Sequence, residues 1–462
     1  IWDLKTQIRD MVPNIVTLPQ YFRGNGYVTA TIGKMFDQRS VDKGMDIPSW
    51  SVPTGGYGKL QPSDYAKGYE NPTNGYQSNE TKAKLAKIEV DARARGLDGA
   101  ELVEFLSKNR GPAVESADVP DDAYTDGIVA KKAVAILSQF AKEKKRFFYA
   151  VGFVKPHLPF ISPKKYWDLY EGVPELEPPP ALAYEDMDPH SKRLMDACDW
   201  RGLEVTPDHI RRSRQGYFAN ISYIDDKIGE ILAVLEASRQ EAIIVFVSDH
   251  GEMLGRKGLW FKMNFFEGSA RVPLMISAPG LTPKRVETPV STIDLTPTLC
   301  DLAGISMEAV MPWTDGESLV PLAKGTERTS PVAMEYAAEG TITPMVCLRQ
   351  GAWKYIHCPA DPDMLFDVAG DPEETENLAG DPRVAEVLAH FQTLAQARWD
   401  LAAYDGEVRQ SQARRWVVYE ALRNGAYYPW DHQPLKLASE RYMRNHMDLN
   451  VLEENKRFPR GE

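Results

Sequence analysis

The feature that most constrains this chain is a short apolar run that turns abruptly polar after residue 247. Residues 243–247 are rich in β-branched side chains, as expected of a buried strand. Ser248-Asp249-His250-Gly251 follows directly. In an open α/β sheet, functional side chains gather at the carboxyl ends of the strands. We therefore predict that Asp249 and His250 stand at such a strand end.

These two side chains offer an oxygen and a nitrogen donor, a pair suited to a divalent cation. Lys262 lies downstream of them, and Arg271 precedes a further apolar run at 272–277. Metal ligands beside cationic side chains suit a doubly charged oxyanion. The stretch 243–274 thus indicates a site for an anionic substrate.

Two other predicted strands end in candidate residues. Gly33-Lys34 follows a predicted strand at 27–32, and for this position alone a solvated lysine is the simpler interpretation. His157 lies in the proline-rich loop 155–159, after a predicted strand at 147–154. It is either a functional histidine or a packed loop side chain, and the pattern alone leaves both interpretations open.

Composition narrows the range of partners. The formal charge of -12 and the pI of about 5.3 argue against nucleic acid as a partner and against long-range attraction of an anion. Any anionic substrate must therefore be captured by local cations. No stretch has the length of a transmembrane helix and no signal peptide is visible, so no membrane partner is predicted.

The cysteines indicate free thiols. Cys198, Cys300, Cys347 and Cys358 form no Cys-x-x-Cys pair, which makes zinc and redox motifs weak interpretations. Four cysteines in 462 residues favour buried thiols in a reducing compartment over a disulfide framework.

The order of the predicted elements indicates an α/β protein. One helix is predicted to start at a cap formed by Asn14 and to end at Gly24-Asn25-Gly26. Residues 37–121 are interpreted as an insertion over the sheet edge, with a helical island inside it. Further helices are predicted at 81–108, 122–146, 207–238, 292–303 and 383–402.

After about residue 310 the pattern changes. Short alternating strands at 331–334, 345–349 and 353–356 predict a small antiparallel sheet. Leu365-Phe366-Asp367 is assigned to polar turns. The last sixty residues are rich in arginine and aromatic side chains, but acidic residues accompany them. Packing on the same or a neighbouring subunit is therefore favoured over nucleic-acid binding.

Three separated motifs carry a family resemblance. They are Gly33-Lys34, Lys155-Pro156-His157, and Ser248-Asp249-His250-Gly251 with Gly258-Leu259-Trp260-Phe261-Lys262 downstream. Together they resemble the sulfatases of the alkaline phosphatase superfamily. Residues 164–462 are most similar to bacterial choline sulfatases, for example in YFANISYIDDKIGE and MEYAAEG. Residues 1–160 look more like the iduronate-2-sulfatase branch, as in LPQYFRGNGYVTATIGKMFD.

The resemblance implies a fold and a division into domains. The fold would be a large mixed, mostly parallel sheet flanked by helices, with a smaller C-terminal α+β subdomain. Residues 1–310 would form the catalytic domain, 311–405 the antiparallel subdomain and 406–462 a tail. The tail would join subunits into a homo-oligomer, a dimer or a tetramer. The choline-sulfatase-like part implies the bacterial cytoplasm, with the periplasm as the alternative.

The resemblance also implies roles for the candidate residues. Asp249 and His250 would be ligands of a divalent cation, calcium first, with magnesium or manganese as alternatives. Lys34 and Lys262 would bind the sulfate oxygens, and His157 would protonate the leaving alcohol. This is chemically coherent, because cleaving a sulfate ester requires neutralised charge on the sulfuryl oxygens and a proton for the leaving group.

Part of the family pattern is not found in this chain. The family nucleophile, a formylglycine matured from Cys-x-Pro-x-Arg or Ser-x-Pro-x-Arg, has no match, because Cys198 begins CDWRG and Cys358 begins CPADP. The paired aspartates of the first strand are also missing. Both would lie N-terminal to Ile1, so we expect this sequence to continue upstream. A histidine commonly found just after Gly-Lys is replaced by Met35-Phe36-Asp37.

The substrate prediction is a small-molecule sulfate ester, with choline sulfate favoured. A quaternary ammonium group requires aromatic side chains and a carboxylate, and Glu339 in MEYAAEG resembles the choline sulfatase carboxylate. Aryl, sugar and alkyl sulfates stay open. The alternatives are a phosphomonoester or phosphodiester hydrolase of the same superfamily, and a truncated, non-catalytic homologue.

Overall fold

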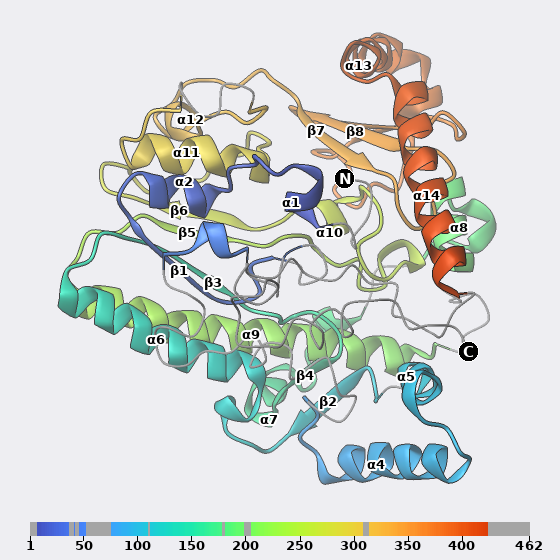
Figure 1. Ribbon diagram of the computed structural model, residues 1–462. Helices are drawn as coiled ribbons and strands as arrows, with labels where there is room; N and C mark the ends of the chain where they lie inside the picture. Colours follow the sequence, from blue (N-terminus) through green and yellow to red (C-terminus); the bar gives the residue numbers. More distant parts are fainter. Residues whose placement is uncertain are drawn as a thin grey trace. The chain divides into compact units, whose positions relative to one another are not determined.

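The computed structural model describes residues 7–36, 41, 46–51, 75–109, 111–177, 181–197, 205–307 and 314–423. The chain, drawn in Figure 1, divides into two compact units. The first comprises Ile1–Leu176, Arg211–Gln240 and Ala413–Glu462, and the second comprises Glu177–Ile210 and Glu241–Gln412. Within the described part of the chain, no helix combines the length and the apolar character that crossing a membrane requires.

The first unit contains a parallel strand pair. β1 (Val28–Gly33) pairs with β3 (Phe147–Gly152), and Gly33 lies opposite Gly152. The predictions of strands at 27–32 and 147–154 are confirmed. α6 (Thr125–Glu143) packs on the pair through its apolar face. The resulting clusters join Ala30 with Ile136 and Phe140, and Ile32 with Val129 and Ala133.

A second parallel pair joins β2 (Val114–Ala117) to β4 (Phe160–Pro163). α7 (Lys164–Trp167) follows β4, and α9 (Pro207–Ser238) confirms the helix predicted at 207–238. An aromatic cluster buries these elements together, because its large rings remove much apolar surface from water. It contains Tyr76, Tyr124, Tyr166, Trp167 and Tyr223.

Two helix predictions in this unit were wrong in detail. α2 (Leu18–Gly24) starts after Thr17, whose side chain accepts a hydrogen bond from the backbone N–H of Gln20, and not after Asn14. The single helix predicted at 81–108 is two helices, α4 (Asn79–Ala94) and α5 (Gly99–Lys108). Gly96 separates them with a left-handed φ of +84°, a conformation that favours glycine and ends a helix.

The second unit contains β5 (Ile244–Val247) and β6 (Leu274–Ser277), which pair antiparallel. The prediction of a fully buried strand at 243–247 was wrong. β5 lies where the strand was predicted but is only half-buried: Val247 is 37% exposed, and Met275 on the paired β6 is 61% exposed.

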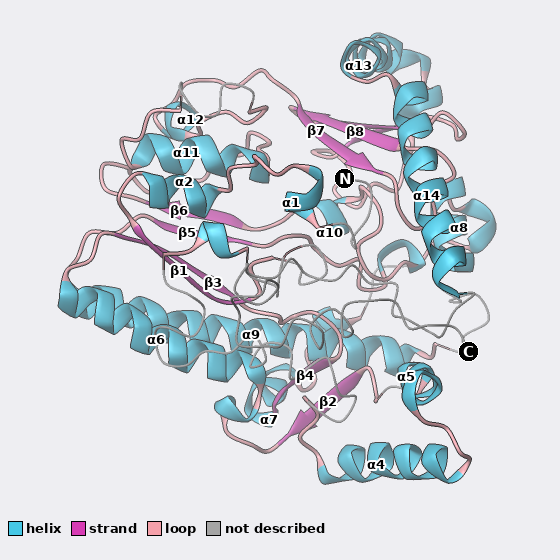
Figure 2. Cartoon of the chain, in the orientation of Figure 1, coloured by secondary structure: helices cyan, strands magenta, loops and turns pink. Residues whose placement is uncertain are grey.

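A four-stranded antiparallel sheet completes the second unit (Figure 2). Its order is β10-β9-β8-β7, from Met364–Asp367, Trp353–His357, Met345–Gln350 and Val332–Tyr336. The assignment of residues 365–367 to a turn was wrong, because they form β10. Met364 and Phe366 pack in one core cluster and Leu365 in another, so β10 is buried on both faces and shows no polar alternation.

The prediction of an α/β protein with a C-terminal antiparallel subdomain is confirmed, whereas the domain boundaries at 310 and 405 stay predictions. The helix predicted at 383–402 is confirmed as α13 (Ala385–Arg398), and a further helix, α14 (Leu401–Arg423), begins near its predicted end. The break between the two helices falls at Trp399-Asp400, where Asp400 accepts a hydrogen bond from the backbone of Ala403. Tail residues 424–462 lie outside the described part.

Three cysteines, Cys300, Cys347 and Cys358, are buried free thiols, as predicted. Burial raises the pKa of Cys347 to about 12 and that of Cys300 to about 11. Such thiols are unreactive near neutral pH, so they are packing residues. Cys198 lies outside the described residues.

Candidate active site

The loop that follows β5 gathers three predicted site residues of the second unit. His250 Nε2 lies 2.6 Å from Lys262 Nζ and 3.6 Å from Asp249 Oδ2. The Asp249 side chain is 59% exposed and that of His250 is 30% exposed. Residues twelve positions apart thus form one partly solvated cluster of a carboxylate, an imidazole and an ammonium group.

Backbone hydrogen bonds close the loop on itself. Met253 N–H donates to Phe261 O (2.8 Å), and Gly255 N–H donates to Leu259 O (2.9 Å). Gly251 N–H donates to Ser269 O (2.7 Å), at the end of α10 (Glu267–Ala270). Lys262 is therefore returned to the strand end by the loop itself and not by its position in the sequence.

Glu252 is a residue of this loop that sequence reasoning missed. Its half-buried carboxylate accepts hydrogen bonds from the backbone N–H groups of Leu254 (3.2 Å) and Phe261. Burial raises its pKa, whereas these two bonds and the charge of Lys262 oppose the rise. Phe261 has a left-handed φ of +66°, so Glu252 holds a strained residue directly before Lys262.

The orientation of His250 follows from its second ring nitrogen. Nδ1 lies 2.8 Å from the carbonyl oxygen of Gly251. A backbone carbonyl can only accept a hydrogen bond, so Nδ1 carries the hydrogen in this contact. The lone pair of Nε2 then faces Asp249 and Lys262. This is the arrangement commonly found for a histidine that binds a metal ion through Nε2.

Glu339 lies in a tight turn between β7 and β8. Thr341 donates to Ala338 O from both its backbone N–H (3.2 Å) and its hydroxyl (2.7 Å). The Glu339 side chain is exposed, and the Tyr336 hydroxyl lies 3.3 Å from its Oε2. The turn therefore presents a carboxylate beside an aromatic ring, which are the two features that a quaternary ammonium group requires.

In the first unit, the ends of β1 and β3 meet closely at two glycines. Gly33 has a φ of +76°, and a Cβ there would lie 1.9 Å from the carbonyl oxygen of Gly152. Lys34 N–H donates to that same oxygen (2.8 Å). No larger side chain can occupy position 33, and Lys34 is thereby held at the carboxyl end of the pair.

The loop that carries His157 is anchored by a buried carboxylate. Asp126 accepts hydrogen bonds from the backbone N–H groups of Val154 (3.0 Å) and Lys155 (2.8 Å). Burial raises the pKa of Asp126, and the charges of Lys155 and Lys34 oppose the rise. The structure thus brings Lys34 into the electrostatic environment of the His157 loop.

Lys155 secures the same loop from within. Its ammonium group donates to the carbonyl oxygens of His157 (3.1 Å) and Pro159 (2.5 Å). Burial lowers its pKa to about 8, against the opposing charge of Asp126. The His157 side chain is exposed, with Nδ1 2.7 Å from Leu158 O. The functional and the packed interpretation of His157 therefore both stay predictions.

Comparison with known proteins identifies the family. Residues 11–305 match the family described as Sulfatase. The chain belongs to the sulfatase family. Residues 406–458 of this sulfatase also match the description "Choline sulfatase enzyme C terminal", and residues 255–399 match "N-sulphoglucosamine sulphohydrolase, C-terminal".

Among relatives of this sulfatase, a choline-sulfatase of Rhizobium meliloti (strain 1021) is 54% identical over 375 residues. The match covers 78% of this chain and 73% of that protein. This share is larger than the segment 164–462, so the resemblance to choline-sulfatase extends N-terminal of residue 164. An iduronate 2-sulfatase of Mus musculus is 32% identical, over 61% of this chain and 48% of that protein.

Solved structures support the fold of this sulfatase. A phosphonate monoester hydrolase of Silicibacter pomeroyi superposes with a TM-score of 0.57 at 21% identity. The superposition covers 82% of this chain and 78% of that one. At this identity the likeness establishes the architecture alone.

Sulfatases generally use a divalent cation, and Asp249 and His250 have donor atoms of suitable type. The exposed carboxylate would supply one ligand. The lone pair of His250 Nε2 accepts a hydrogen bond from Lys262 in this structure, so it would supply a second ligand only after Lys262 has left that contact. Among the described residues, the two are not part of any group of three His, Cys, Asp or Glu side chains close enough to hold an ion. The pair is therefore compatible with part of a metal site, and the chemistry it would supply is the neutralisation of sulfuryl charge.

One acidic group elsewhere is close enough to hold an ion, but a lysine already neutralises it. Asp121, Asp226 and Glu230 lie together in the first unit. Lys227 Nζ lies 2.5 Å from Asp121 and 3.1 Å from Asp226, and it also bonds Glu230. This group is a partly exposed ion-pair network around the buried Lys227, and it contains none of the predicted metal ligands.

Proposed function

We propose that this protein hydrolyses a small-molecule sulfate ester to an alcohol and sulfate, with choline sulfate as the favoured substrate. The observation that carries the proposal is the loop 248–262, where the Lys262 ammonium lies 2.6 Å from His250 Nε2, beside the Asp249 carboxylate. The 54% identity to a protein named choline-sulfatase supports the choice of alcohol.

Each candidate residue has a proposed role in this reaction. Lys262 and Lys34 bind the sulfuryl oxygens, and their charge stabilises the negative charge that develops there. His157, whose side chain is exposed on an anchored loop, protonates the leaving oxygen. Asp249 and His250 hold a divalent cation, for which we propose calcium.

Choline recognition is assigned to the turn between β7 and β8. Glu339 supplies the negative charge for the trimethylammonium group, and the ring of Tyr336 supplies an aromatic face. Tyr336 was missed in the sequence, because only the turn places its hydroxyl 3.3 Å from the Glu339 carboxylate.

The experiment that tests this proposal is an assay of the complete gene product. Choline sulfate and 4-nitrophenyl sulfate would be supplied after treatment with a chelator, and calcium, magnesium or manganese would be restored separately. We expect sulfate release from choline sulfate, lost on chelation and best restored by calcium. Absence of sulfate release with every cation would contradict the proposal.

Replacing Glu339 with glutamine is expected to impair recognition of choline selectively. Two unit charges ~4 Å apart attract by about 1 kcal/mol in water and more where water is excluded, so KM for choline sulfate should rise about five- to tenfold. The kinetics for 4-nitrophenyl sulfate, which has no ammonium group, should be unchanged. Glu327→Gln, at an exposed position of the same unit, serves as the matched control. An unchanged KM for choline sulfate would argue against this role.

We also propose a homo-oligomer, a dimer or a tetramer, assembled through the tail 406–462. The match of residues 406–458 to the choline sulfatase C terminus supports this. Deletion of residues 430–462 should lower the oligomeric state measured by sedimentation velocity. An oligomer that persists after the deletion would refute the assignment.

A further inference from the structure

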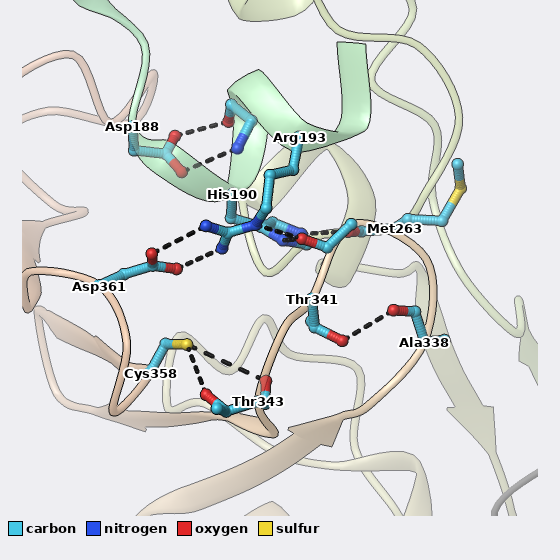
Figure 3. Close-up of polar contacts among 11 residues, drawn as sticks. Asp188, His190, Arg193, Met263, Ala338, Thr341, Thr343, Cys358 and Asp361 are labelled. Atoms are coloured by element: carbon cyan, nitrogen blue, oxygen red, sulfur yellow. Dashed lines mark hydrogen bonds and ion pairs between the residues drawn. The ribbon is translucent and has the colours of Figure 1, made fainter. Parts of the chain in front are cut away.

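Helix α8 (Pro189–Ala197) connects two loops of the proposed site. His190 is 2% exposed, and its Nε2 lies 2.7 Å from Met263 O while its Nδ1 lies 3.2 Å from Gly340 O (Figure 3). Met263 directly follows Lys262, and Gly340 directly follows Glu339. One buried imidazole therefore contacts the backbone beside the proposed sulfate ligand and beside the proposed ammonium ligand.

A second side chain of α8 reaches the same turn. Arg193 Nε donates to Gly340 O (2.6 Å), and its two terminal nitrogens bind the two carboxylate oxygens of Asp361 end-on. The pairing is visible in Figure 3, where the guanidinium and the carboxylate face each other. Such bidentate pairs have a well-defined geometry. Arg193 thereby fixes the Gly340 carbonyl against a third segment of the unit.

The turn also packs directly on the helix. Gly340 has a φ of +80°, and a Cβ there would lie 2.7 Å from Leu194 Cδ2 and 3.2 Å from His190 Cε1. The ring of Tyr336 packs edge-on against that of His190, at 5.9 Å between centroids. Asp188 secures the start of α8 by accepting the N–H of Ser191 (3.0 Å). Packed contacts and hydrogen bonds therefore hold the Glu339 turn on α8.

We propose that α8, through the positioning residues His190 and Arg193, sets the separation of Lys262 and Glu339 and thereby the length of sulfate ester that the site accepts. This inference rests on the proposed function. A substrate with sulfate at one end and a cation at the other must satisfy both ligands at once, so their separation selects a spacer of matching length. Substrates without the cationic end make no use of Glu339, so they are insensitive to the position of its turn.

The test compares two substrates in the complete gene product. In His190→Ala the ratio of kcat/KM for choline sulfate to that for 4-nitrophenyl sulfate should fall by about five- to tenfold, as it should when Glu339 itself is removed. In a Glu339→Gln background, His190→Ala should cause no further fall in this ratio. The carboxylate that His190 would position is then already absent. Arg193→Lys, which keeps the charge but loses the bidentate pair with Asp361, provides a second variant should His190→Ala not fold.

His390→Ala, at an exposed histidine of the same unit, is the matched control and should leave the ratio unchanged. Equal losses on both substrates, or an additive loss in the double variant, would mean that α8 has a structural role alone, and would overturn this inference while leaving the proposed function intact. No hydrolysis of choline sulfate by the unaltered protein would overturn both.

Discussion

Replacing Lys262 with alanine is expected to lower kcat/KM for choline sulfate by about 10²–10³-fold, the range seen when one preorganised donor to a developing oxyanion is removed. The Lys262 ammonium is oriented by His250 Nε2 at 2.6 Å. Its backbone is held as well, because the carbonyl oxygen of Lys262 accepts from Ser269 Oγ and from Asn264 N–H (2.9 Å). The alanine variant therefore loses a positive charge that the surrounding hydrogen bonds hold in a fixed position.

Steady-state kinetics on choline sulfate and on 4-nitrophenyl sulfate would measure this effect. Both substrates should lose rate, since both have a sulfuryl group, and this distinguishes Lys262 from Glu339. Lys284→Ala, at an exposed lysine of the same unit, should have no effect. Activity that Lys262→Ala leaves unaltered would remove the basis for the site assignment.

Replacing Lys354 with methionine is expected to lower the free energy of unfolding by about 3–5 kcal/mol, as when one partner of a buried ion pair is removed. Lys354 is fully buried on β9, with Nζ 2.5 Å from Glu267 Oε1 and 2.8 Å from Glu374 Oε1. It also donates to Phe265 O (2.9 Å). Without it, the buried Glu374 and the partly buried Glu267 lose their countercharge.

The loss should depend on pH in a defined direction. Burial raises the pKa of Glu374 above its unfolded value, while Lys354 opposes the rise. In Lys354→Met that opposition is gone, so the folded state binds a proton at higher pH than the unfolded state does. Stability then increases as pH falls through the folded pKa toward the unfolded one. The deficit relative to wild type should be smaller at pH 5 than at pH 8.

Urea denaturation followed by tryptophan fluorescence would measure the deficit, with Lys284→Met as the surface control. A deficit below about 1 kcal/mol, within the range of exposed pairs, would show that Lys354 is not the countercharge that the buried carboxylates require. A deficit independent of pH would show that neither carboxylate changes its protonation when the lysine is lost.

Much of the fold could be predicted because its strands and helices have periodic apolar patterns. β1, β3, β5 and α9 all lie where the pattern predicted them. The errors have local causes. β10 is buried on both faces, so it lacks the alternation that marks a strand. A glycine divides α4 from α5, and a helical pattern continues across it.

The candidate site could be predicted only in part, because some of its residues belong to local motifs and others are brought in by backbone or long-range contacts. Asp249 and Lys262 were both predicted from motifs of one loop, and the backbone hydrogen bonds that fold this loop bring them together. Glu252 acts through the backbone N–H groups that fold around it, which no residue pattern reveals. His190 meets Gly340 across 150 positions of sequence, a contact that only tertiary structure specifies.

The most direct test of the central claim measures whether the protein releases sulfate or phosphate from the corresponding choline ester. The complete gene product would receive choline sulfate and phosphocholine at equal concentrations, and sulfate and phosphate would be quantified by ion chromatography. The sulfatase assignment predicts that sulfate is released faster than phosphate and that Lys262→Ala suppresses this release. Faster release of phosphate, or no release of sulfate, would contradict it.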